Sequence, residues 1–284
     1  INNKFVSFDL DGTILDDNSS VANSSIDAIV NLMKVGIIFS SNSGRSVRRS
    51  QEPLKRWPDM ASNLFIGAYN GGVVVDRERN GNRKLIYVER LSCQLFEEIS
   101  VFAKDKGLNL ICCMFEEKED FLIEEYRHSL PSAGLKLFGG PGFVHDSNLH
   151  ERISRNELLS PPKVMIVTGE LERDSILHEV RKRWGQKVYA TWSIPDRIEI
   201  MPSNIDKSQS LRALVDLVGV GMDEVLAIGD GENDIPMLEM AGVGILMGNA
   251  ETALKCSIKD SSIRIGPSIT EDGFSAMLRE YIPT

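Results

Sequence analysis

Aspartate side chains follow two separate apolar runs of the chain, 5–8 and 225–229, and could together hold a metal ion. They are Asp9 and Asp11 after the first run, and Asp230 and Asp234 after the second. Open α/β sheets bind ligands in the crevice beyond the carboxyl ends of their strands. If Asp9 and Asp230 meet there, their repulsion at 4 Å is about 1 kcal/mol in water and about 4 kcal/mol at an effective dielectric of 20. Carboxylate oxygens without His or Cys suit Mg²⁺, which would offset this repulsion.

Each acidic motif also has a purely structural alternative. Asp11-Gly12 is a dipeptide that is common in surface turns. Asp234 stands where a helix begins, and aspartate is a frequent helix cap. Asp230 precedes that cap region and has no such explanation.

Two further motifs suggest phosphate binding. The segment 40–45, which ends in Ser43-Gly44-Arg45, follows a second strand candidate and offers a hydroxyl and backbone N–H groups, although it could also be a polar loop. Lys207 stands at the beginning of a helix, although cations are usually favoured near the C-terminus of a helix. Taken alone it could be a solvent-exposed lysine; together with the other motifs it is a candidate anion ligand.

The elements that must position these residues alternate between strand and helix patterns. Near the N-terminus, a strand at 5–8, apolar residues at helical spacing from 26 to 33 and a strand at 36–40 form a βαβ unit. A second such series is predicted at 197–200, 210–218, 225–229, 237–240 and 243–247. Both ends of the chain therefore indicate a parallel, doubly wound α/β sheet.

The middle of the chain indicates an inserted α+β module. Its predicted helices and strands are 94–104 and 171–184, and 108–114, 163–168 and 187–191. Gly- and Pro-rich segments at 138–142 and 160–162 separate these elements, and the acidic run 116–120 is expected to be a solvated turn.

Composition limits the classes of function. The 284 residues suggest about two domains, and 42% hydrophobic with 26% charged residues is typical of a soluble folded protein. Net charge is 32 − 41 = −9, which argues against a nucleic-acid or membrane-surface partner. The four cysteines form no CxxC motif, and no run resembles a signal peptide or a membrane span, so a cytoplasmic location is predicted.

The ordered motifs resemble those of the haloacid-dehalogenase-like (HAD) superfamily. The matching residues are Asp9-x-Asp11-Gly12-Thr13, Ser43-Gly44-Arg45, Asn70-Gly71-Gly72, Lys207 and Gly229-Asp230-Gly231-Glu232-Asn233-Asp234. The segments 229–237 and 241–250 look most like the Cof-type phosphatases of that superfamily. The resemblance covers 1–82 and 197–284, whereas the block between them matches an α/β cap by position more than by sequence.

This resemblance implies a role for each motif. Asp9 would be the nucleophile that forms an aspartyl-phosphate, and Asp11 the general acid and base. Mg²⁺ would be held by Asp9, the Asp11 carbonyl and Asp230, with Asp234 as a direct ligand or as a partner of one. The phosphate and substrate would contact Ser43, Gly44, Arg45, Asn70, Lys207 and Asn233. Ser43 stands where the family often has Thr, and Ser208 where it usually has Gly; neither change removes a reacting group.

The predicted fold is a doubly wound, mostly parallel HAD-like core of 1–82 plus 197–284, with an inserted α+β cap of 83–196 that sets specificity. The predicted function is Mg²⁺-dependent hydrolysis of small phosphorylated metabolites, most notably sugar phosphates, by a monomer or small homo-oligomer. A sugar phosphomutase and a phospho-acceptor signalling module are the alternatives. Four central residues could contact a sugar or belong to the surface: Glu124, Arg127, His128 and His145.

Overall fold

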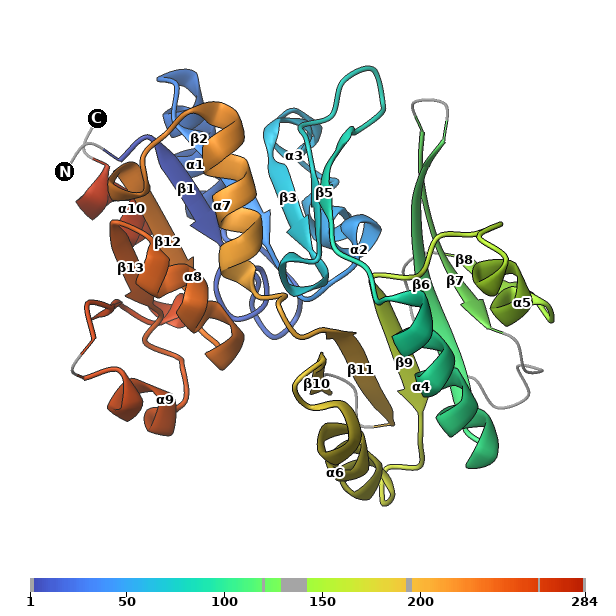
Figure 1. Cartoon of the computed structure of the whole chain (residues 1–284). Coiled ribbons are helices and arrows are strands. Elements are labelled where there is room, and N and C mark those ends of the chain that lie inside the picture. Colours follow the sequence, from blue (N-terminus) through green and yellow to red (C-terminus); the bar gives the residue numbers. More distant parts are fainter. Residues whose placement is uncertain (1–2, 119–120, 129–141, 193–195, 260, 283–284) are drawn as a thin grey trace. The chain divides into compact units, whose positions relative to one another are not determined.

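The chain folds into two compact units, which are described separately. The computed structural model describes residues 3–118, 121–128, 142–192, 196–259 and 261–282 (Figure 1). Unit 1 comprises Ile1–Tyr87 and Asp206–Thr284, and unit 2 is Val88–Ile205.

Unit 1 contains an eight-stranded sheet in the order β14-β13-β12-β1-β2-β3-β4-β5. Its strands are β1 (Phe5–Phe8), β2 (Ile38–Asn42), β3 (Phe65–Ala68), β4 (Val73–Val75), β5 (Leu85–Val88), β12 (Val225–Gly229), β13 (Val243–Leu246) and β14 (Arg264–Ile265). The pairs that run from β14 to β3 are parallel, and β3 pairs with β4 in antiparallel fashion.

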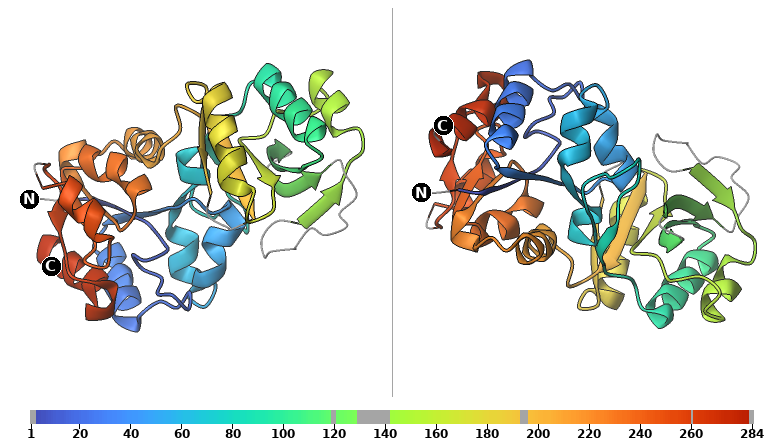
Figure 2. Two further views of the ribbon diagram at one scale, coloured as in Figure 1. Left: turned by 90° about the horizontal axis from the view of Figure 1, so that it is seen from below. Right: turned by 90° about the horizontal axis from the view of Figure 1, so that it is seen from above.

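Helices cover both faces of this sheet. They are α1 (Asn23–Lys34), α2 (Val47–Gln51), α3 (Pro58–Asn63), α7 (Lys207–Val218), α8 (Ile235–Met240), α9 (Thr252–Ser257) and α10 (Gly273–Tyr281). Along β12, Leu226 and Ile228 pack in the core with α1 and α10, whereas Val225 and Ala227 pack with α7 and α8. Helices α1 and α10 lie side by side on one face (Figure 2). Burial on both faces explains why the central strands are continuous apolar runs rather than alternating ones.

Unit 2 is a six-stranded, mostly antiparallel sheet with helices packed on it. The sheet order is β10-β11-β9-β6-β7-β8, and only β7 and β8 are parallel among the described pairs. Its strands are β6 (Asn109–Lys118), β7 (Phe121–His128), β8 (Gly142–His145), β9 (Lys163–Val167), β10 (Val188–Thr191) and β11 (Arg197–Pro202). Its helices are α4 (Cys93–Asp105), α5 (Leu149–Ser154) and α6 (Arg173–Trp184), whose apolar residues share one core with the sheet.

The predicted fold class, a doubly wound, mostly parallel core with an inserted α+β unit, is confirmed, but two local predictions are wrong. Residues 197–200 belong to β11, which pairs antiparallel with β9 and β10, so they lie in unit 2 rather than in the core series. The alternating residues Arg197-Ile198-Glu199-Ile200 indicate a strand, but so short a segment does not specify which sheet it joins, which explains the error. Residues 116–118 of the acidic run extend β6 instead of forming a turn, while 119–120 and most of the glycine-rich segment, 138–141, lie outside the described residues.

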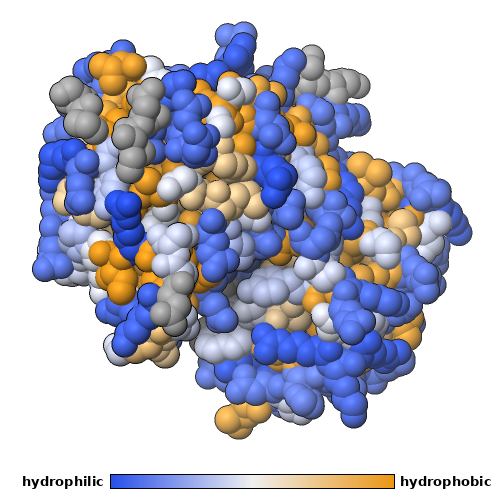
Figure 3. All heavy atoms as spheres, turned by 60° about the vertical axis from the view of Figure 1, so that its left-hand side comes forward, coloured by the Kyte–Doolittle hydropathy of each residue, from blue (hydrophilic) through white to orange (hydrophobic). Residues whose placement is uncertain are grey.

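The surface view (Figure 3) shows how polar and apolar side chains are distributed. Hydrophilic side chains predominate on the face shown in Figure 3, where hydrophobic ones lie among them in separate groups. In the part of the chain that the structure describes, no helix combines the length and apolar character needed to cross a bilayer.

Candidate active site

Three aspartates meet at the carboxyl edge of the unit 1 sheet. Strands β1 and β12 are parallel neighbours, and the backbone N–H of Asp9 donates to the Ile228 carbonyl at 2.9 Å, so both strands end at the same place. As a result, carboxylate oxygens of Asp9, Asp230 and Asp234 lie within 4.8 Å of one another. Asp9 and Asp234 are buried, whereas Asp230 is partly exposed.

Lys207 is buried beside this cluster and is not a solvent-exposed lysine. It is the first residue of α7, a start fixed by Asp206, whose side chain accepts a hydrogen bond from the Ser208 N–H at 2.8 Å. The Lys207 Nζ donates to Asp9 Oδ1 and to Asp234 Oδ1, both at 2.5 Å. Burial alone would lower the pKa of Lys207, but the two carboxylates hold it above its usual range.

The charges of this cluster fit a divalent cation. With all three carboxylates ionised, they and the one ammonium give a formal charge of −3 + 1 = −2. Burial, together with the neighbouring carboxylates, raises the pKa of Asp9 to about 8 against the opposing effect of Lys207, and that of Asp230 to about 6. Both shifts mean that the ionised carboxylates are poorly stabilised, chiefly because they are buried and in part because they repel one another. A Mg²⁺ ion would bring the sum to zero, and an all-oxygen donor set is the one it prefers.

The carboxylate of Asp234 is held in a fixed orientation. Its Oδ2 accepts hydrogen bonds from the backbone N–H groups of Asp230 and Gly231, each at 2.9 Å, while its Oδ1 contacts Lys207. The loop after β12 is therefore built around this side chain. Asp234 does more here than cap a helix, because it links the lysine to the loop that carries Asp230.

Asp11 and Arg45 form a two-point ion pair outside the three-aspartate cluster. The Arg45 Nε donates to Asp11 Oδ2 at 2.7 Å, and its second terminal nitrogen contacts Asp11 Oδ1. The Asp11 side chain is 57% exposed. Arg45, expected among the phosphate-binding residues, thus pairs with the expected acid–base residue in this structure.

The other predicted phosphate-site residues are linked across three loops. Ser43 is buried after β2, and its carbonyl accepts from the Asn70 N–H at 3.0 Å. Asn70 has a positive φ of 56°, and its Oδ1 accepts from Asn233 Nδ2 at 3.1 Å. A side chain on Gly44 would meet the same Asn70 amide at 3.1 Å, so glycine permits this close approach.

Thr13 and Asn249 lie in segments that the sequence analysis singled out, but it gave neither residue a role in the site. The Thr13 hydroxyl donates to Asp230 Oδ1 at 3.4 Å, and Asn249 Nδ2 approaches Asp230 Oδ2 at the same distance. Asn249 follows β13, the neighbour of β12, so its place after a third strand of the same sheet was the available signal.

The four candidate sugar contacts all lie in unit 2. Glu124 and His128 are buried on β7, so the surface interpretation is wrong for them. Arg127 contacts Glu125 and Asp146, and the ring of exposed His145 lies 5.3 Å from that of His128.

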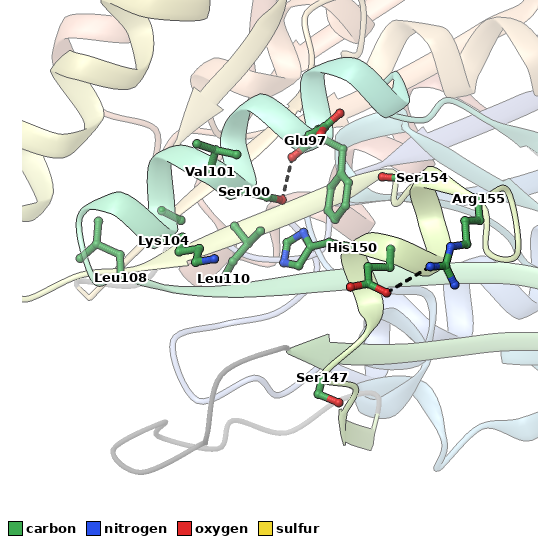
Figure 4. Close-up of a pocket in the computed structure, with 13 residues that line it drawn as sticks. Glu97, Ser100, Val101, Lys104, Leu108, Leu110, Ser147, His150, Ser154 and Arg155 are labelled. Atoms are coloured by element: carbon green, nitrogen blue, oxygen red, sulfur yellow. Dashed lines mark hydrogen bonds and ion pairs between the residues drawn. The ribbon is translucent and has the colours of Figure 1, made fainter.

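One described cavity lies in unit 2, whereas the aspartate cluster lies in unit 1. The cavity measures about 530 Å³, lies along α4 and α5 in unit 2, and contains the stacked rings of Phe96 and His150, 5.4 Å apart (Figure 4). None of the predicted site residues lines it. A cavity of about 490 Å³ in unit 1 is lined by Asp230 and Asn249 among others, and it adjoins the cluster.

A doubly wound α/β unit with acidic residues after two neighbouring central strands, a buried lysine and an inserted second unit defines a class of hydrolases. The chain belongs to the haloacid dehalogenase-like hydrolase family, whose model matches residues 6–278. The predicted superfamily, and with it the prediction of an enzyme, is confirmed.

Three similar proteins illustrate the relationship. 5-Amino-6-(5-phospho-D-ribitylamino)uracil phosphatase YcsE of Bacillus subtilis is 23% identical, with 98% of this chain and 96% of YcsE covered. The crystal structure of TM0651 from Thermotoga maritima has a TM-score of 0.80 at 24% identity, covering 99% and 98% of the two chains. The HAD subclass IIB sugar phosphatase BT4131 has a TM-score of 0.70 at 19% identity, covering 98% and 99%.

Proposed function

We propose that this enzyme is a Mg²⁺-dependent phosphatase that hydrolyses small phosphorylated metabolites, with sugar phosphates as the main substrate class. The observation that carries the proposal is the convergence of three carboxylates on buried Lys207 in a chain of this hydrolase family. Mg²⁺ would be held by Asp9, the backbone carbonyl of Asp11 and Asp230, with Asp234 beside them, and would supply positive charge to the phosphoryl oxygens.

Hydrolysis would proceed in two steps through Asp9. Its carboxylate attacks phosphorus, an aspartyl-phosphate forms, and the bond to the leaving oxygen breaks as Asp11 gives that oxygen a proton. Asp11 then takes a proton from water, which attacks the aspartyl-phosphate and regenerates Asp9 with release of inorganic phosphate. Lys207 and Asn233, with the hydroxyl and backbone N–H groups around Ser43, would bind the phosphoryl oxygens through both steps.

The substrate class is supported by the named relatives. BT4131 is a sugar phosphatase, and YcsE acts on a compound with a phosphorylated ribityl chain. Both substrates are small and rich in hydroxyl groups. Unit 2 is the proposed source of specificity for the leaving group. We also propose that the enzyme is cytoplasmic and is a monomer or a small homo-oligomer.

Two substitutions test the mechanism. Asp9→Asn should reduce phosphate release from p-nitrophenyl phosphate to background with the fold intact, because the amide cannot act as the nucleophile. Asp27→Asn, at an exposed position of α1, makes the same chemical change away from the site and should keep full activity. Turnover retained by Asp9→Asn would refute the mechanism, and activity unchanged by EDTA would refute the metal requirement.

A panel of phosphorylated metabolites then tests the substrate class. Sugar and sugar-alcohol phosphates should have the highest kcat/KM. Dependence on a bisphosphate activator would instead favour a phosphomutase, and a stable aspartyl-phosphate without turnover would favour a signalling module.

A further inference from the structure

The side chain of Asn249 connects three other segments of unit 1 at the edge where the aspartates meet. Its Nδ2 donates to the Gly12 carbonyl at 2.8 Å and approaches Asp230 Oδ2 at 3.4 Å. Its Oδ1 accepts from the Ile269 N–H at 2.9 Å. One amide therefore contacts the loop after β1, the loop after β12 and the segment that follows β14.

The backbone fixes where this amide lies. The Met247 N–H donates to the Gly229 carbonyl at 2.8 Å, and the Gly248 N–H to the Pro267 carbonyl at 3.0 Å. Since β13, β12 and β1 are consecutive parallel neighbours, these bonds hold Asn249 beside the two loops that carry the aspartates. An asparagine fits because it can donate to one loop while accepting from another.

Asp230 is the member of the cluster that most needs support. It is the partly exposed one of the three aspartates, and Asp9 and Asp234 repel its charge. Unlike Asp9 and Asp234, it has no described hydrogen bond to Lys207; its described partners are the weak contacts at 3.4 Å from Thr13 and Asn249. Without them, rotation of this carboxylate towards water would relieve the repulsion.

We propose that Asn249 is a positioning residue for the metal site, because it keeps Asp230 and the Gly12 turn directed towards Asp9. Gly12 belongs to the same arrangement: a side chain there would lie 2.1 Å from Asp230 Oδ2, so the turn and the carboxylate are in direct contact. The inference rests on the proposed function only in taking Mg²⁺ as the bound ion.

The test measures Mg²⁺ binding to the full chain without substrate, by calorimetry and by the rise in thermal midpoint with Mg²⁺. Loss of an outer partner of a metal ligand typically costs about 10–100-fold in affinity, and we expect Asn249→Ala to fall in that range. Asn63→Ala is the matched control: Asn63 is exposed, and its Nδ2 also donates to a backbone carbonyl at 2.8 Å, but that carbonyl belongs to Asp59. The control should bind Mg²⁺ like the wild type.

Thermal midpoints in EDTA separate loss of metal affinity from loss of folding. If Asn249→Ala does not fold, Asn249→Ser, which keeps an oxygen near the Ile269 N–H, is judged by the same criterion. Wild-type Mg²⁺ affinity in the folded variant would overturn the proposal, as would equal weakening in the Asn63 control. A wild-type protein that binds Mg²⁺ but hydrolyses no phosphate ester would refute the proposed function and leave this result interpretable.

Discussion

Replacing Lys207 by methionine should strongly destabilise the metal-free protein. The Lys207 ammonium contacts two buried carboxylates, those of Asp9 and Asp234, and its loss would leave them without this positive charge. At an effective dielectric of 20, each pair at 2.5 Å corresponds to about 7 kcal/mol before the cost of burying the charges is subtracted. Removal of one partner from a buried ion pair costs about 3–5 kcal/mol net. We expect Lys207→Met to lose that much unfolding free energy at pH 8 in EDTA.

The loss should shrink with Mg²⁺ and at lower pH. A bound Mg²⁺ would supply the missing positive charge from outside the chain. The pKa of Asp9, already about 8 from burial, rises further without the lysine. A carboxyl group whose folded pKa lies above its unfolded value favours folding at low pH, and this contribution is lost as pH rises through the folded pKa. The variant should therefore approach wild-type stability towards pH 5.

Hydrogen exchange of peptides from β1 and β12 in urea reports the stability of unit 1 specifically. Lys4→Met is the matched control, because Lys4 forms a 2.6 Å ion pair with Glu224 in the same unit, with side chains 51% and 26% exposed. Such a surface pair contributes about 0.2–1 kcal/mol. If Lys207→Met cost no more than the control, or the same with and without Mg²⁺, the assignment of Lys207 as the charge that compensates the cluster would be refuted.

Three further predictions concern the site and its surroundings. Gly12→Ala and Gly219→Ala both place a side chain at a positive φ, 73° and 71°. This backbone conformation should cost each variant about 1–2 kcal/mol of stability. Only the Gly12 variant should lose Mg²⁺-dependent activity, because only its side chain collides with Asp230; equal activity would contradict this. Iodoacetamide at pH 8 should label the two exposed cysteines and spare Cys112 and Cys113, since burial raises both thiol pKa values, that of Cys113 to about 12. Inorganic phosphate should raise the thermal midpoint with Mg²⁺ and have little effect in EDTA, and an equal shift in both would argue against a metal-dependent anion site.

The sequence was sufficient to predict the position of Asp9 and Asp230, because each follows an apolar run that becomes a central parallel strand. It was also sufficient to predict the division into two kinds of sheet. It could not predict that Asp11 would pair with Arg45, since rotation of exposed side chains leaves no pattern in the chain. The partnership of Gly12 with Asn249 was equally hidden, because it joins residues 237 positions apart through one side-chain amide.

The errors in unit 2 have a different cause. Strand β7 contains the charged residues Glu124, Glu125 and Arg127, a pattern that favours a surface segment. It becomes a strand because the sheet supplies partners on both sides, β6 and β8, and this pairing is a tertiary effect that local propensity does not contain. The direction of β11 was undetermined for the same reason: its neighbours, and not its own residues, set it.

The acidic character of the chain and its proposed anionic substrate are compatible because charge is compensated locally. The net charge of −9 belongs to the whole protein, whereas phosphate would meet a cluster whose formal charge is −2 when all three carboxylates are ionised. Without a cation, that cluster repels a phosphate dianion at short range. A Mg²⁺ ion would bring this formal charge to zero, and the buried Lys207 and the N–H groups around Ser43 would then donate to phosphate without that repulsion. Metal binding should thus precede substrate binding, because the ion offsets the three carboxylates that would otherwise repel the phosphate.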